Sequence, residues 1–208
     1  MGIAERKQRE KEARIEQIVQ SAIVLFRKKG FNNTSMTEIA DHAELSKGTL
    51  YIYFKSKEEL FFKILEPVLM QFDKDLKQKA AKETESADKT LLRIVDRFYE
   101  LHVEKPEATQ MLTRFKAKEF KELLKPKEFE KITGLMNENL ATLQKVIQRG
   151  IEQRIFDECD TMVTSVIIWN TVMGVVLYQE NRVYGGKNDY IQSTLNAAIE
   201  LLINGLRK

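Results

Sequence analysis

The 208-residue sequence contains a single cysteine, Cys159, and only three prolines and nine glycines. One cysteine excludes an internal disulfide framework and any metal site built from several thiolates. The scarcity of turn-forming residues argues against collagen-like, low-complexity and β-rich folds. Lys, Glu, Leu, Ile, Ala and Gln are instead plentiful, and these residues favour helix. The composition therefore predicts an all-α globular protein.

We also expect no secretory leader, because residues 1–14 are highly charged and contain no apolar core segment. With its single cysteine, the chain is expected to be cytoplasmic. The longest uncharged run, residues 161–179, approaches the length of a membrane span. Polar residues dilute this run, and Asn170 would lie in the middle of the bilayer. We therefore expect no membrane span, but a helix buried in a core or a subunit interface.

Catalytic patterns are missing as well. The sequence has no glycine-rich nucleotide loop, no P-loop and no zinc-protease motif, and its two histidines, His42 and His102, lie far apart. We expect no enzyme activity, no metal and no cofactor. Two further classes remain open, namely a helical carrier of lipids and an adaptor that uses apolar helices on another protein. The segment 46–57 distinguishes these two classes from a DNA-binding protein, because a carrier or an adaptor has no need of its residue pattern.

The charge is distributed unevenly along the chain. Its net charge is only +3, which does not by itself indicate a nucleic-acid partner. Residues 1–57 contain 11 Lys and Arg against 7 Asp and Glu, whereas residues 58–208 contain 23 against 24. The positive excess therefore lies in the N-terminal quarter, where it would suit a DNA backbone.

Apolar residues recur at helical spacing throughout the chain and predict about nine helices joined by short loops. The first predicted helix ends at Gly30. Ser35 and Glu38 match a capping box that would start the second, and Ser46 would cap the third. We expect two domains, residues 1–57 with a helix-turn-helix and residues 58–208 with the remaining helices.

The predicted third helix carries side chains that suit a DNA duplex. Ser46 and Thr49 offer hydroxyls, and Lys47 offers charge. Gly48 would let the backbone approach closely. Two tyrosines and a lysine at the next helix start add donors for phosphate: Tyr51, Tyr53 and Lys57.

The same region resembles the DNA-binding segment of TetR-type transcriptional regulators over roughly residues 12–62. The linked positions that carry the resemblance are Gly30-Phe31, Thr34-Ser35-Met36, Ile39-Ala40, Ala43, Leu45-Ser46-Lys47-Gly48, Leu50-Tyr51, Tyr53-Phe54, Lys57 and Leu60. The resemblance implies an all-α homodimer that binds a palindromic operator, represses transcription and is released by a small ligand. The chain departs from the family at Glu44, where glycine is common, and at Tyr53, where histidine is common.

The resemblance also implies individual roles. Lys47, Gly48 and Thr49 would meet base edges or nearby phosphates. Tyr51, Tyr53 and Lys57 would contact phosphates of the DNA, and Thr34 or Ser35 would contact the DNA backbone. The last two long helices would pair with those of a second subunit through Val163, Ile167, Gly174, Leu177, Leu195, Ala198, Ile199 and Leu202.

A pocket for a hydrophobic or amphipathic ligand is expected in the C-terminal domain, although the same residues would equally form a filled core. The candidate lining residues are Phe98, His102, Met111, Phe115, Met136, Leu140, Trp169, Asn170 and Met173.

Overall fold

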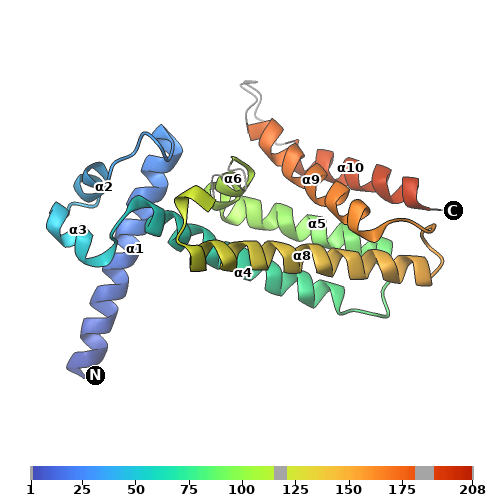
Figure 1. Ribbon diagram of the computed structural model, residues 1–208, viewed down its shortest axis with the longest axis horizontal. Helices are drawn as coiled ribbons and strands as arrows, with labels where there is room; N and C mark the ends of the chain where they lie inside the picture. The colour runs from blue at the N-terminus through green and yellow to red at the C-terminus, as the bar shows by residue number, and fades with distance from the viewer. Residues whose placement is uncertain (1, 115–120, 181–189, 208) are drawn as a thin grey trace. The chain divides into compact units, whose positions relative to one another are not determined.

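The computed structural model describes residues 2–114, 121–180 and 190–207 (Figure 1). The regular secondary structure of these residues is helical, apart from one isolated antiparallel bridge between Phe156 and Arg207, and loops join the helices. The all-α prediction is therefore confirmed. None of the described helices combines the length and the apolar character that a membrane span requires. The chain divides into two compact units, Met1–Glu66 and Pro67–Lys208.

The first unit contains α1 (Ile3–Lys29), α2 (Met36–His42), α3 (Lys47–Tyr53) and the start of α4 (Lys57–Ala80). One stripe of α1 is buried, including Ile18, Ala22 and Leu25, as the apolar spacing predicts. The Phe31 ring lies between two other rings, with its centroid 5.2 Å from that of Phe26 and 5.3 Å from that of Phe61. This aromatic cluster joins α1, the loop that follows it and the start of α4.

The second unit contains the rest of α4 and five further described helices (Figure 1). These are α5 (Ala87–Glu104), α6 (Pro106–Arg114), α8 (Pro126–Glu152), α9 (Thr161–Glu180) and α10 (Ile191–Leu206). Helix α8 packs against α9 and α5, while α10 packs against α5 and α9. Phe72, Phe98 and Trp169 bring α4, α5 and α9 together, with ring centroids 5.6 to 6.0 Å apart.

Helix α4 belongs to both units, because the division between them falls at Pro67 inside this helix. Our division of the chain by function, at residue 57, lies at the first turn of the same helix and stays a prediction.

One glycine of the second unit is required by its packing. A Cβ on Gly150 of α8 would lie 2.1 Å from the Phe156 ring, which is itself buried. Glycine at this position therefore lets the chain after α8 fold back onto the helix.

Candidate nucleic-acid interface

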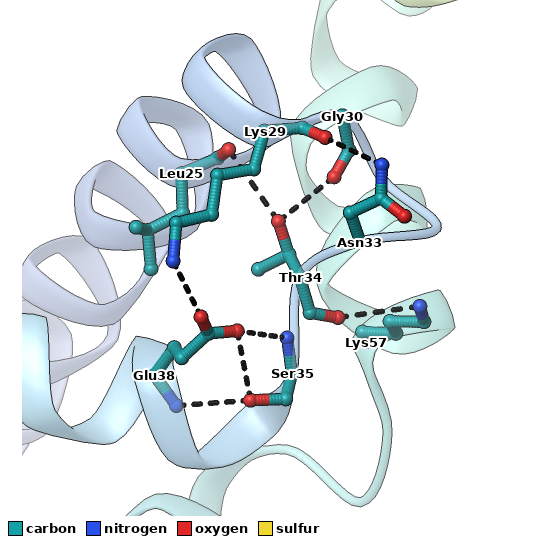
Figure 2. A network of polar contacts seen from close by, with 8 residues as sticks. All are labelled: Leu25, Lys29, Gly30, Asn33, Thr34, Ser35, Glu38 and Lys57. Atoms are coloured by element: carbon teal, nitrogen blue, oxygen red, sulfur yellow. Dashed lines mark hydrogen bonds and ion pairs between the residues drawn. The ribbon is translucent and has the colours of Figure 1, made fainter.

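The loop between α1 and α2 is held by its own polar groups (Figure 2). Gly30 ends α1 with φ +81°, a conformation that favours glycine. The Thr34 hydroxyl is directed at the carbonyl oxygens of Gly30, at 2.8 Å, and Leu25, at 3.4 Å. Thr34 is only 3% exposed. Its hydroxyl therefore serves the loop, and the contact that we predicted with a DNA backbone would have to replace these bonds.

The predicted capping box of α2 is confirmed. The Ser35 hydroxyl accepts the Glu38 N–H at 3.2 Å, and the Glu38 carboxylate accepts the Ser35 N–H at 2.8 Å. Lys29 of α1 also pairs with this carboxylate (Figure 2). Hydrogen bonds from Lys29, then from the backbone N–H and the hydroxyl of Ser35, lower the pKa of Glu38 to about 2. Glu38 thus joins the end of α1 to the start of α2.

Lys57, at the start of α4, holds the same loop from the other side. Its ammonium lies 3.0, 3.2 and 3.3 Å from the carbonyl oxygens of residues 31, 32 and 34, and 4.6 Å from the centroid of the Phe31 ring. Lysine has three N–H donors, so these carbonyls account for all of them. A phosphate contact by Lys57, as we predicted, would require one of these bonds to be released.

The turn between α2 and α3 contains the glutamate that departs from the family pattern. Glu44 has φ +53°, in the left-handed region that residues other than glycine rarely adopt. The turn is fixed by the Leu45 N–H, which donates to the Ala40 carbonyl at 2.9 Å. Gln17 of α1 also donates to the Ala43 carbonyl at 2.8 Å. The turn therefore keeps its geometry without glycine, at the expense of local strain.

Helix α3 is anchored on one side and open on the other. Ser46 caps it, since its hydroxyl accepts the Thr49 N–H at 3.1 Å. Leu50 is fully buried, and Phe54, one turn later, is also buried. Lys47 and Gly48 are exposed, and Thr49 is half-buried. The predicted base-reading residues therefore share the outer part of a helix whose inner side is fixed in the core.

Gly48 is not needed by the fold. Its φ is outside the left-handed region, and a Cβ placed on it would meet only the Ser46 hydroxyl oxygen, at 3.9 Å. Alanine in a helix is more stable than glycine by about 1 kcal/mol. The protein thus carries a helix-destabilising residue on an open face for which its own packing gives no reason.

Tyr51 and Tyr53 are half-buried, so each packs partly against the domain and leaves part of its surface in solvent. Ile52 between them is 73% exposed, which sequence reasoning missed. Its position four residues after Gly48 places it on the same face and would have indicated it. An exposed isoleucine at this position suits apolar contact with a thymine methyl.

The residues predicted to line a ligand pocket differ in burial, and two of them, Phe98 and Trp169, have their rings in contact. Phe98, His102 and Met111 are buried. The His102 ring nitrogen Nδ1 lies 2.8 Å from the Thr109 hydroxyl, a pairing typical of a core histidine. Asn170 is exposed, because it lies on an outer face of α9. The half-buried members are Met136, Leu140, Trp169 and Met173, and Phe115 lies outside the described residues.

The space beside these residues is small. The cavity lined by Phe72, Phe98 and Trp169, among others, has a volume of about 10 Å³, enough for one water molecule. The core is therefore filled at this point. A larger groove of about 690 Å³ lies between the end of α4 and α8, and its lining includes Lys77, Thr142 and Arg149.

An apolar face remains open on α9 and α10. Val163 and Ile167 are 53% and 47% exposed, Gly174 is exposed, and Leu177, Ala198 and Leu202 are half-buried. Leu195 and Ile199 are instead buried within their own unit, so they serve the subunit core. Leu201, which we did not predict, is 73% exposed. An exposed apolar face is therefore present on α9 and α10. On α10, however, Leu201 lies on this face in place of Leu195 and Ile199.

Comparison with known proteins agrees with this geometry. Residues 18–64 match the family described as bacterial regulatory proteins, tetR family. Over 48 residues the chain is 50% identical to the uncharacterized HTH-type transcriptional regulator YuxN of Bacillus subtilis, a match that covers 23% of this chain and 16% of YuxN. The fatty acid metabolism regulator protein of B. subtilis is 23% identical over 95% of this chain and 98% of its own length.

A solved structure shares the fold. The crystal structure of the transcriptional regulator FadR from B. subtilis in complex with stearoyl-CoA has a TM-score of 0.69 and 20% identity, over 92% of this chain and 99% of that one. Residues 18–64 thus match the family of bacterial regulatory proteins called tetR, and the chain as a whole shares the fold of a solved transcriptional regulator.

Proposed function

We propose that this protein is a homodimeric, sequence-specific DNA-binding transcriptional regulator that acts in the cytoplasm. It represses from a palindromic operator and is released by a small hydrophobic or amphipathic ligand. The observation that carries this proposal is Gly48, an exposed helix glycine that the fold itself does not require. A duplex that comes within contact distance of α3 supplies the missing reason, because a side chain there would keep the two backbones apart.

On the outer part of α3, Lys47 and Thr49 meet base edges or adjoining phosphates. The exposed Ile52 adds an apolar contact, and the hydroxyls of Tyr51 and Tyr53 bind phosphates. Ser46 and Ser35 cap their helices by accepting backbone N–H groups, and the O–H of either hydroxyl can donate to a phosphate oxygen; for Ser35 this releases its bond to the Glu38 carboxylate. The Ser35–Glu38 pair and Lys57 hold the helices at the angle that this docking needs.

A second subunit is needed because one short helix in one groove binds weakly. Two copies of α3 that lie about 34–36 Å apart would enter successive major grooves. The open apolar face of α9 and α10, with Ile167 and Leu201 exposed, supports dimerisation through these helices. Apolar surface of this kind is removed from water when two copies pair.

The ligand binds in the second unit and acts on DNA binding through α4, which both units share. A ligand shifts this equilibrium only if it binds the two states with different affinity. The stearoyl-CoA in the similar FadR structure supports an apolar or amphipathic ligand for this chain as well.

Selection of bound duplexes from a random DNA pool near 0.15 M salt tests the proposal. We expect a palindromic consensus. Salt-sensitive bulk binding without any enriched sequence would contradict it, provided that the protein has first been stripped of bound ligand by unfolding and refolding.

A further inference from the structure

The core of the second unit contains a polar side chain without a partner. Asn139, in the middle of α8, is 0% exposed, and neither its Oδ1 nor its Nδ2 has a hydrogen-bond partner in the part of the chain that the structure describes. Proteins pair nearly all of their buried polar groups, because water no longer compensates an unpaired one. A fully buried primary amide with both of its atoms unpaired therefore calls for a physical reason.

A second polar atom of this kind comes from the neighbouring helix. Asp73 of α4 has one carboxylate oxygen, Oδ1, that is buried without a partner. Its other oxygen accepts a hydrogen bond from Lys77 at 2.9 Å, and Lys77 also pairs with Glu138, the residue before Asn139. Lys77 thus joins α4 and α8 at the level of both unpaired groups. Asp73 needs a donor there, while Asn139 needs both a donor and an acceptor.

A cluster of apolar rings lies about one helical turn from Asn139. Leu143, one turn after Asn139 on the buried face of α8, lines the small cavity together with Phe72, Phe98 and Trp169. Phe72 also directly precedes Asp73 on α4. An apolar chain that displaced these rings would therefore lie within about one helical turn of Asn139 and beside the residue that precedes Asp73.

The groove between α4 and α8 begins near the same turn of α8. Its lining includes Lys77 and also Thr142, which is three residues after Asn139 and therefore close to it on the helix surface. Its volume of about 690 Å³ is within the range of small-molecule sites. The lining also contains Lys145 and Arg149 together with Glu83 and Glu152, so a ligand part in the groove would be polar.

We propose that Asn139 and Asp73 form the hydrogen-bonding middle part of the ligand site, between its apolar and its polar ends. This inference deepens the proposed function and rests on it. The ligand is an amphipathic molecule whose apolar chain displaces the rings of Phe72, Phe98 and Trp169, which fill the core in the present structure, and whose polar part lies in the groove. An uncharged group that both donates and accepts, such as a secondary amide, joins the two parts. Its N–H donates to the Oδ1 of Asp73, and its carbonyl accepts from the Nδ2 of Asn139, so each of the two side chains gains one partner.

The single tryptophan gives a readout that is independent of DNA. Trp169 is the only tryptophan of the chain and belongs to the ring cluster, so its fluorescence reports entry of a ligand. The probes are N-methyldecanamide, methyl decanoate and dodecane, which have similar apolar length. The amide offers a donor and an acceptor, the ester an acceptor only, and the alkane neither. The amide is the most strongly hydrated of the three, so a preference for it requires specific partners.

We expect the protein to bind the amide about tenfold more tightly than the ester, a difference typical of one or two well-placed hydrogen bonds. Asn139→Leu keeps the branched outline of the side chain and should bring this ratio close to one, with unchanged or raised thermal stability. Asn137→Leu, a change on the exposed side of α8, should keep the ratio.

Three results would overturn the proposal. One is that the protein binds none of the three probes, or binds the amide no more tightly than the ester. Another is a preference that persists in Asn139→Leu. The third is a crystal structure of the probe-saturated protein in which only a water molecule bridges Asn139 and Asp73. A failure of operator selection, with the amide preference intact, would instead count against the proposed function and leave this site standing.

Discussion

The ammonium of Lys57 lies 4.6 Å from the centre of the Phe31 ring and within hydrogen-bond distance of three carbonyls in the loop before α2. A lysine at the start of a helix next to a DNA-reading element is easily interpreted as a phosphate contact. In this structure the same lysine joins the first turn of α4 to the loop that positions α2. A motion of α4 would therefore be transmitted to the reading element through this residue.

Replacement of Lys57 separates the two roles. We expect Lys57→Met to destabilise the protein by about 1–2 kcal/mol, because carbonyls that accept from a charged donor lose it. Operator affinity should fall, while the slope of log Kd against log salt stays unchanged. Lys47→Met, at an exposed position of α3, should leave stability unchanged and reduce the slope by about one. Thermal unfolding and titrations at several salt concentrations measure both quantities. A reduced slope in Lys57→Met would show that this lysine does contact a phosphate.

Gly48→Ala tests the reason for the glycine on α3. The variant should be as stable as the parent or more stable by up to about 1 kcal/mol, because alanine favours helix and the added methyl has open space. Operator affinity should nevertheless fall at least about tenfold, since the methyl would lie between α3 and the duplex. Gly134→Ala of α8, where a Cβ also meets nothing within 4 Å, is the matched control and should keep full affinity. Equal affinity of the two variants would remove the main support for docking through α3.

The carboxylate of Glu38 gives the first unit a defined dependence on pH. Because the pKa of Glu38 is lowered from 4.5 to about 2, its charged form stabilises the fold above pH 4.5, and this contribution is lost as the pH falls toward 2. Glu38→Gln should therefore be less stable than the parent at pH 6, and the difference should shrink between pH 4.5 and 2. Chemical unfolding at a series of pH values measures it. A difference that is constant over this range would contradict the role of the Lys29 and Ser35 contacts.

The open face of α9 and α10 predicts how the dimer can be broken. Ile167→Glu and Leu201→Glu each place a charge on an exposed apolar position and should raise the dimer dissociation constant more than tenfold, with helix content unchanged. Val103→Glu changes an equally exposed apolar residue of α5 and should leave the dimer intact. Sedimentation measurements distinguish these outcomes. Dimers that persist in both variants would place the interface elsewhere.

Features that depend on neighbours along the chain were predictable from the sequence. The caps at Ser35 and Ser46, the end of α1 at Gly30 and the burial of Leu50 all follow from spacings of a few residues. The role of Lys57 was not predictable in this way, because the carbonyls that it binds lie 23 to 26 residues away along the chain.

The wide apolar stripe of α10 shows a second limit. Spacing alone cannot tell Leu195, which is buried in the subunit, from Leu201, which faces solvent, because both lie on apolar parts of one helix. Asn139 illustrates a third limit, since a polar residue among Leu and Ile reads as a surface position until its burial is known. In each case tertiary packing decides the outcome.

Operator recognition by α3 is tested most directly by the selection of duplexes with the parent protein and with Gly48→Ala, in parallel and from the same random pool. We predict a palindromic consensus for the parent, with half-sites about one helical turn apart, and its loss in Gly48→Ala. The same consensus from both proteins, or an enriched sequence without two-fold symmetry, would contradict recognition of an operator by α3 in a symmetric dimer.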